Sequence, residues 1–267
     1  MKEEKRVEKR ESVSYVKKVV PKKVVPVPVV KAKKSKAKLR KSISKTRRAK
    51  IAIVLDDWGY NTRNLDMLSE IDQPLTIAIL PFRPFSRRVA EFANKNNCEV
   101  IIHMPMEPID IESVDLEPKT LMLYMGSGTV QSILRDAFQN IPYAKGINNH
   151  MGSRATGDSE YMSHVFKELK IKNLYFLDSL VVADSVCAAA AKEVGVKFAK
   201  RSIFLDNSSD DLYIRAQVME LVDSADDNGY AIGIGHDRES TLKVLKELIP
   251  ELEEQGYEFV FVSDLVK

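Results

Sequence analysis

The sequence predicts an α/β fold built on parallel strands, and two observations support that prediction. From residue 50 onward, short β-branched runs alternate with amphipathic segments. The runs are apolar on both faces, which is typical of parallel strands that helices cover. Right-handed crossovers then leave an open α/β sheet or a closed barrel. Seven or eight strands in about 215 residues favour the barrel.

The predicted elements follow from hydrophobic period and from turn residues. We expect strands near residues 51–55, 75–80, 99–103, 145–149, 173–177, 196–205, 230–235 and 258–262. We expect helices at residues 85–97, 129–140, 158–170, 209–228 and 239–255. Asp237 or Ser240 is expected to cap the last of these helices. No internal repeat of fixed period is visible.

Charge divides the chain into two segments. Residues 1–50 hold 20 Lys and Arg against 4 Asp and Glu, so the remainder holds 41 − 20 = 21 basic and 38 − 4 = 34 acidic residues. Residues 1–48 mix Pro with Lys at low complexity and hold almost no large apolar side chains other than Val. We therefore expect a disordered arm, which serves as a solvated linker or tether or binds polyanions, followed by a barrel domain over residues 49–267.

The sequence argues against a membrane span, nucleotide binding and specific nucleic-acid binding. The chain shows no signal peptide and no membrane span, because the longest early apolar stretch, VVPVPVV, is short and holds two prolines. DDWGYN stands where a Gly-rich phosphate loop would follow the first strand, which argues against nucleotide binding. Nucleic-acid binding rests on charge alone, so no specific nucleic acid is expected. We expect Cys98 and Cys187 to be buried free thiols, which leaves the compartment undetermined.

Five side chains at the ends of apolar runs form a candidate metal site. His103, His150 and His236 each end such a run, and Asp56 and Asp57 end the first. Residues at the carboxyl ends of parallel strands converge on the ligand crevice, however distant they are in sequence. The alternatives are a turn or helix-capping role for the aspartates and a satisfied core position for a histidine. Because alternate strand residues face opposite sides, we expect at most one of the two aspartates to face the interior unless the strand ends there.

Further polar residues on the same loops are candidates for supporting roles. The segment KGINNHMGSRATGD concentrates amides and hydroxyls that are costly to bury without partners, so it is either a wet loop or a ligand contact. Arg154 could orient a carboxylate or an oxyanion. Glu107 is either an acid behind the metal ligands or solvent-facing, and Asp178 and Asp206 are either site acids or loop caps. His164 falls opposite the apolar face of its helix and is assigned to solvent. The expected substrate-binding set is Asn148, Asn149, Ser153, Asp178 and Glu107, with Thr156 among the neighbouring polar groups.

An aspartate with two histidines is a nitrogen and oxygen ligand set suited to Zn²⁺, with Fe²⁺, Co²⁺ or Ni²⁺ also possible. Three protein ligands leave one position open for water. A water of lowered pKa, with one free carboxylate as base and one free histidine as acid, suffices to hydrolyse an amide or an ester.

Seven blocks resemble one known family. IAIVLDDWGY, LTIAILPF, IIHMPMEP, GINNHMGSR, YFLDS, FLDN and AIGIGH stand in the order and spacing of the divergent polysaccharide deacetylases, relatives of the NodB-homology carbohydrate esterases. The resemblance runs from about residue 49 to the end. It implies a distorted seven-stranded (β/α) barrel and metal-dependent removal of N-acetyl groups from a polysaccharide. It also implies that Asp56 is the general base, that Asp57 and His103 bind the metal, and that His236 is the general acid.

Two features depart from the family pattern. Members of the wider superfamily carry two metal-binding histidines in HxxxH, but Glu107 stands four residues after His103. His150 is the unassigned histidine at a strand end and is the predicted third ligand. The family is typically exported, yet no signal is visible here, so no location is predicted.

The predicted function is a metal-dependent hydrolase, most simply a Zn²⁺ enzyme, that removes N-acetyl or O-acetyl groups from a polysaccharide such as peptidoglycan. Asp56, His236 and Arg154 would be catalytic, and Asp57, His103 and His150 would hold the metal. The alternative is a catalytically silent carbohydrate-binding or envelope-associated protein that keeps the barrel and the metal. We expect a monomer.

Overall fold

The computed structural model describes residues 49–267, and the predicted disordered arm at residues 1–48 lies outside the described residues. The strands are β1 (Lys50–Trp58), β2 (Thr76–Ile79), β3 (Glu99–Met106), β4 (Gly146–Met151), β5 (Tyr175–Asp178), β6 (Phe198–Lys200), β7 (Ile203–Phe204), β8 (Tyr230–His236) and β9 (Glu258–Phe259). The helices are α1 (Leu65–Leu68), α2 (Ser86–Lys95), α3 (Ser127–Asn140), α4 (Ser159–Lys172), α5 (Cys187–Val194), α6 (Asp211–Asn228) and α7 (Glu239–Glu254), with 3₁₀ turns η1 (Ala155–Gly157) and η2 (Val262–Asp264).

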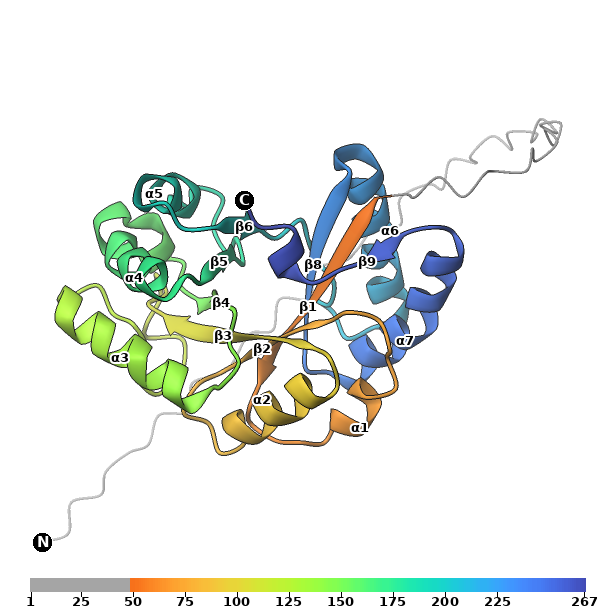
Figure 1. Ribbon diagram of the computed structural model, residues 1–267, viewed down its shortest axis with the longest axis horizontal. Helices are drawn as coiled ribbons and strands as arrows, with labels where there is room; N and C mark the ends of the chain where they lie inside the picture. The colour runs from red at the N-terminus through yellow and green to blue at the C-terminus, as the bar shows by residue number, and fades with distance from the viewer. Residues whose placement is uncertain (1–48) are drawn as a thin grey trace, which may run out of the picture. The chain divides into compact units, whose positions relative to one another are not determined.

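All strand pairs are parallel and follow the order β6-β5-β4-β3-β2-β1-β8-β7, with β9 beside the start of β1. Figure 1 shows the helices outside the curled strands. The predicted parallel α/β barrel is therefore confirmed, and it is distorted, as the resemblance implies. The single strand expected at residues 196–205 is two short strands.

The division of this segment into β6 and β7 is what distorts the barrel. Strand β6 pairs with β5, whereas β7 pairs with β8, and two residues join them. The Arg201 N–H donates to the Asp178 carbonyl on one side, and the Ser202 N–H donates to the Ile232 carbonyl on the other. The Arg201 guanidinium donates to the carbonyls of Ser179 and Leu180 and stacks 3.7 Å from the centre of the Phe204 ring. The chain itself therefore links the two edge strands where no continuous ladder does.

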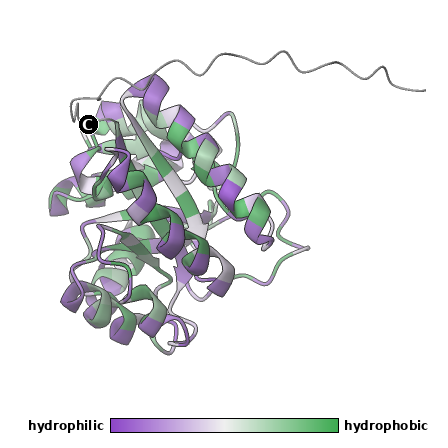
Figure 2. Ribbon diagram, turned by 90° about the vertical axis from the view of Figure 1, so that its right-hand side faces the viewer, coloured by the Kyte–Doolittle hydropathy of each residue, from purple (hydrophilic) through white to green (hydrophobic). Residues whose placement is uncertain are grey.

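The strands bury two apolar layers because successive side chains alternate between faces. The odd-numbered residues of β1 from Ile51 to Leu55 pack against the helices in one cluster, while Ala52 and Val54 belong to a second cluster inside the barrel. Figure 2 shows pale and green strands beneath helices that alternate green and purple. Each helix therefore turns an apolar stripe inward, as a parallel sheet requires.

The C-terminal segment closes the amino end of the barrel. After β9, Val260, Val262 and Leu265 enter the interior cluster. A buried carboxylate, Glu99, accepts hydrogen bonds there from Thr76, from the Tyr175 hydroxyl and from the Ser263 N–H. The strand expected at residues 258–262 is therefore only two residues long, because its second half is used as a plug.

The predicted helices are confirmed, whereas the predicted cap of the last helix is not. Helices 85–97, 129–140, 158–170, 209–228 and 239–255 are confirmed to within two residues at each end. The predicted cap on α7 is wrong, because Arg238 occupies the N-cap with no side-chain bond and Asp237 instead accepts from Asn64. Both cysteines are free; Cys187 is buried and Cys98 half-buried. None of the helices between residues 49 and 267 combines the length and hydropathy needed to cross a bilayer.

We predict that Gly146→Ala destabilises the barrel. A Cβ there would lie 2.7–2.8 Å from three atoms of the Tyr175 ring, which its hydroxyl bond to Glu99 holds in place. Overpacking of this kind costs about 1–3 kcal/mol, measurable as a lower midpoint of urea unfolding. Gly128→Ala in α3 is the matched control, since a Cβ there meets nothing within 4 Å. Equal midpoints for the two variants would contradict the prediction.

Candidate active site

Strand alternation selects which polar residues meet at the carboxyl end of the barrel. Asp56 follows Ala52 and Val54 on the interior face of β1, and His103 follows Ile101 on the interior face of β3. By the same period of two, Asn148 and His150 lie on the interior face of β4, and His236 follows Ile232 and Ile234 on β8. Four of the five strand-end residues singled out from the sequence therefore share one face.

Asp57 joins them through an irregularity in the strand. Alternation would turn it toward the helices, with Leu55. Instead its backbone is left-handed, with φ of 66°, and the register between β1 and β2 shifts between Leu55 and Trp58. Aspartate tolerates this conformation better than most residues, and a bulge re-aims the side chain that follows it. Both carboxylates therefore face the site, which is the exception that the expectation allowed for a strand end, since the pairing of β1 with β8 stops at Asp56.

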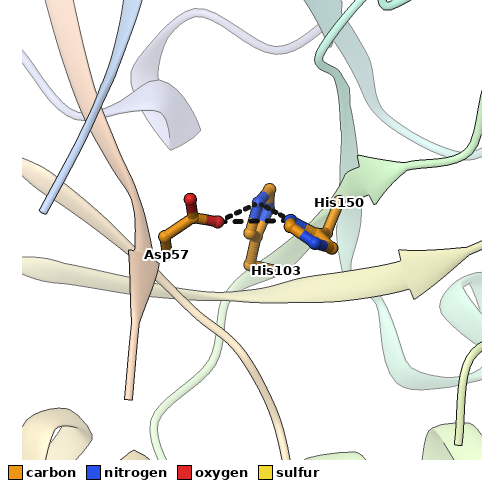
Figure 3. Close-up of side chains that lie close together, drawn as sticks. All are labelled: Asp57, His103 and His150. Carbon is orange, nitrogen blue, oxygen red and sulfur yellow. Dashed lines mark hydrogen bonds and ion pairs between the residues drawn. The ribbon is translucent and has the colours of Figure 1, made fainter. Parts of the chain in front are cut away.

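Asp57, His103 and His150 form a triangle of ligand atoms (Figure 3). Asp57 Oδ1 lies 3.2 Å from His103 Nε2 and 3.2 Å from His150 Nδ1, and the two nitrogens are 3.1 Å apart. Atoms that bind one ion tetrahedrally at about 2.0 Å lie about 3.3 Å apart. Asp57 Oδ1 is also buried without a well-aligned hydrogen bond, so a positive charge, from a protonated imidazole or from a cation, must offset its charge. The residues present therefore fit a divalent ion.

Electrostatics supports the same interpretation. Burial opposes charge on Asp57, but His103 and His150 outweigh it and hold the pKa of Asp57 far below its usual value. Burial likewise opposes charge on His103, but Asp56 and Asp57 raise the pKa of His103 to about 9. The cluster thus favours a positive charge at its centre. An ion that binds there must displace the proton, so metal binding weakens as the pH falls below that value.

Asp56 is buried beside the triangle. One of its oxygens accepts a hydrogen bond from the Asn148 amide at 2.8 Å, and the other lies 3.6 Å from His103 Nε2. Burial is the largest influence on Asp56 and raises its pKa, although His103 and His236 act in the opposite direction. A carboxylate with a raised pKa accepts a proton more readily, so Asp56 has the properties of a general base.

His236 stands across the interior from His103, next to Asp56 in the pairing of β8 with β1. Its Nδ1 lies 2.7 Å from Asp206, whose other oxygen accepts from the His236 N–H and from Thr241. Phe204 stacks on the imidazole at a centroid distance of 6.1 Å. Burial lowers the pKa of His236, but Asp206 outweighs it and the net pKa is raised. The imidazole is thus oriented and disposed to carry a proton.

Three residues of the predicted substrate-binding set make hydrogen bonds within the protein. Asn149 and Asp178 lie on the opposite strand face from Asn148 and Leu177, toward the helices. Asn149 bonds the backbone of Ser179 and Met151, and Asp178 accepts from Leu180 and Ser185. Ser153 accepts from the Ile109 N–H. These contacts fix loops, so Asp178 is the loop cap that the sequence left open.

Glu107 and Arg154 form a pair next to the site. Glu107 is buried, and it accepts from the Leu123 N–H and pairs with the Arg154 guanidinium at 3.0 Å. Within residues 49–267 neither side chain has a recorded contact with the triangle. Only one guanidinium nitrogen of Arg154 pairs with Glu107 and the side chain is 54% exposed, so its other N–H donors could reach a substrate oxygen.

The remaining polar candidates lie apart from the cluster. Thr156 is buried and donates to the Gly152 carbonyl, so it fixes the turn after β4. The assignment of His164 to solvent is only partly right, because the side chain is half-buried, its Nδ1 is buried, and its ring packs 6.3 Å from the ring of Tyr161.

Sequence reasoning missed several contacts that shape the site. It identified Asp206 as a strand-end acid but did not pair it with His236. It grouped Asn148 with its neighbour, although the two face opposite ways. It did not single out Arg201, Thr241 or Ser179. Period-two alternation on β4 was the signal that could have separated the two asparagines.

The family model for divergent polysaccharide deacetylases matches residues 53–266. The chain belongs to this family. The uncharacterized protein YibQ of Escherichia coli K12 is 40% identical over 203 residues, which are 76% of this chain and 63% of that protein. The chain thus spans less than two thirds of that relative.

A Haemophilus influenzae protein, also uncharacterized, is 35% identical over 207 residues, which are 78% of this chain and 73% of that protein. Among solved structures, an uncharacterized protein from Agrobacterium tumefaciens C58 matches with a TM-score of 0.78 at 22% identity, over 84% of this chain and 92% of that one. A mutant of a Bacillus anthracis family 4 carbohydrate esterase pseudoenzyme with restored enzymatic activity matches with a TM-score of 0.50 at 17% identity, over 82% and 67%. These structures share the fold.

We predict that His103→Ala and His150→Ala each weaken Zn²⁺ binding by tenfold or more, because each removes one vertex of the triangle. Isothermal titration calorimetry with Zn²⁺ measures the effect. His164→Ala is the matched control, since this histidine lies on α4 away from the cluster. Unchanged Zn²⁺ affinity in either ligand variant would show that the triangle does not hold the metal.

We also predict that Asp206→Asn lowers the pKa of His236. The carboxylate is what raises that pKa against burial, so a neutral amide leaves burial dominant. The paired His236 stabilises the fold below pH 6.5, and that contribution is lost as the pH rises through the raised pKa. NMR titration of His236 measures the shift, with Asp211→Asn on α6 as the control. An unshifted titration in Asp206→Asn would contradict this account.

Proposed function

We propose that this protein is a metal-dependent hydrolase that removes N-acetyl or O-acetyl groups from a polysaccharide. The observation that supports it best is the Asp57–His103–His150 triangle with a buried carboxylate outside the triangle, Asp56, on one side and an oriented histidine, His236, on the adjacent strand. Membership of the divergent polysaccharide deacetylases supports the class of substrate.

The proposed chemistry divides between the ion and the chain. A divalent ion such as Zn²⁺, when bound, would polarise the acetyl carbonyl and lower the pKa of water. Asp56 accepts the proton of the attacking water, which suits its raised pKa. His236 then donates a proton to the leaving amine or alcohol while Asp206 balances its charge. A backbone N–H, or an N–H of Arg154 that does not pair with Glu107, would steady the developing oxyanion.

The donor set suits Zn²⁺ among the possible ions, since one carboxylate and two imidazoles leave a fourth position open. Fe²⁺, Co²⁺ and Ni²⁺ bind similar ligands. The site is reachable from solvent. The exposed fraction of the side chain is 33% for Asp57, 16% for His150 and 22% for His236. We propose that the barrel over residues 49–267 acts as one catalytic domain and as a monomer.

A second candidate is a protein that binds carbohydrate without turnover. The departure from HxxxH at Glu107 favours it, and one structural neighbour is a restored pseudoenzyme. Against it stands Asp56, because a protein that only binds glycans gains nothing from a buried carboxylate with a raised pKa beside a metal ligand.

Acetate release from acetylated chitooligosaccharides and from peptidoglycan separates the two candidates. We predict metal-dependent release that a chelator stops and Zn²⁺ restores. Asp56→Asn should lower kcat by a factor of about 100 or more, because general base catalysis contributes about 10²–10⁴-fold, while Zn²⁺ still binds. Asp66→Asn on α1 is the control. Glycan affinity without acetate release from any substrate would favour the second candidate.

A further inference from the structure

One buried amide, Asn148, links the two halves of the proposed chemistry. It is fully buried on β4, and its Cα is paired with that of His103 on β3. Its Oδ1 lies 2.8 Å from His103 Nδ1, and its Nδ2 donates to Asp56 at 2.8 Å. Strands β4 and β1 are separated by β2 and β3, so this side chain crosses the barrel interior.

Hydrogen-bond direction fixes how the amide is oriented. An ionised carboxylate only accepts, so the Asn148 NH₂ must face Asp56 and its carbonyl must face His103. The imidazole must then carry a proton on Nδ1, so that once its second proton leaves, the lone pair of Nε2 points at Asp57 and His150. The second amide hydrogen points to the Ser179 hydroxyl at 3.3 Å, and that hydroxyl donates to the Asn149 carbonyl.

The neighbouring asparagine shows that this is more than burial of a polar group. Asn149 is equally buried, but its side chain bonds only backbone atoms. The partners of Asn148 are instead Asp56, His103 and a hydroxyl that fixes the amide. Asn148 is fully buried, so its partners are these groups of the protein, and the role that these contacts give it differs from the predicted substrate contact.

We propose that Asn148 is a positioning residue that joins the general base Asp56 to the metal ligand His103 in one hydrogen-bonded chain. Its carbonyl selects the tautomer of His103 that can bind an ion, and its NH₂ aims the carboxylate of Asp56. The inference rests on the proposed function for the role of Asp56, but its metal-binding half stands without turnover.

An aspartate at position 148 separates the two roles. Asn148→Asp keeps an acceptor for His103 Nδ1–H but loses the donor to Asp56 and places a second carboxylate against it. Asn148→Ala loses both contacts. Partners behind metal ligands are typically worth about 10–100-fold in metal affinity. We therefore expect Asn148→Ala to weaken Zn²⁺ binding about 10–100-fold, while Asn148→Asp stays within about threefold of the wild type.

In contrast to Zn²⁺ affinity, kcat should fall in Asn148→Asp as well as in Asn148→Ala. We expect Asn148→Asp to lose at least about tenfold in kcat with KM within about threefold, because the base is misaimed while the metal remains. Asn64→Asp is the matched control, since its amide also donates to a carboxylate, that of Asp237, at 2.7 Å. It should change neither Zn²⁺ affinity nor kcat by more than about threefold. A wild-type kcat in Asn148→Asp, or equal losses of Zn²⁺ affinity in both Asn148 variants, would overturn the proposal.

A spectroscopic test on the wild-type protein does not depend on whether a variant folds. In the wild-type protein loaded with Zn²⁺, ¹⁵N NMR of the histidines should show a proton on Nδ1 of His103 and metal on Nε2. The opposite assignment overturns the proposal. If the wild type releases no acetate from any glycan, the proposed function is wrong. The protonation of His103 Nδ1 and the Zn²⁺ affinities of the Asn148 variants would still decide whether Asn148 positions a metal ligand. A crystal structure of Asn148→Asp then shows whether Asp56 turns away.

Discussion

The alternation of side chains along parallel strands is the constraint on which this site depends. Asp56, His103 and His236 share the interior face because each stands an even number of residues from an interior apolar side chain on its own strand. Asn148 and His150 join them because each stands an odd number of residues from Ile147, which faces the helices. Strand pairing then sets their heights, with His103 level with Asn148 and Asp56 level with His236. A slip of one residue in any of these strands would turn its polar group toward the helices.

The bulge at Asp57 is the one break in that alternation, and it makes the triangle possible. A regular strand would leave Asp56 facing inward and Asp57 facing outward. The left-handed backbone at Asp57 brings adjacent carboxylates to the same side, where their repulsion would be large without a positive charge between or beside them. The strained backbone of Asp57 and the two like charges thus lie at one point, where His103 and His150 offset the charge. Strained residues often occur at functional sites.

The proposed third ligand, His150, stands on a different strand from the second histidine of the HxxxH pattern. In HxxxH both imidazoles come from one strand end, but here Glu107 is turned toward Leu123 and Arg154. His150 lies on the neighbouring strand, level with Pro105 and two residues beyond Asn148, so it reaches the outer side of His103. Its imidazole meets that of His103 edge to face, at a centroid distance of 4.8 Å. The family membership of the chain and this departure are therefore compatible.

The sequence by itself determined the parallel α/β class, the main helices and the strand ends at which polar residues gather, because hydrophobic period and turn residues are local signals. It also indicated which histidines stand at strand ends. It could not settle that both aspartates face inward, that Asn149 and Asp178 face outward, or that the strand expected at residues 196–205 splits. Those outcomes depend on register, on one left-handed residue and on the way the chain closes the barrel. These are properties of pairing between distant segments, so only the tertiary structure could decide them.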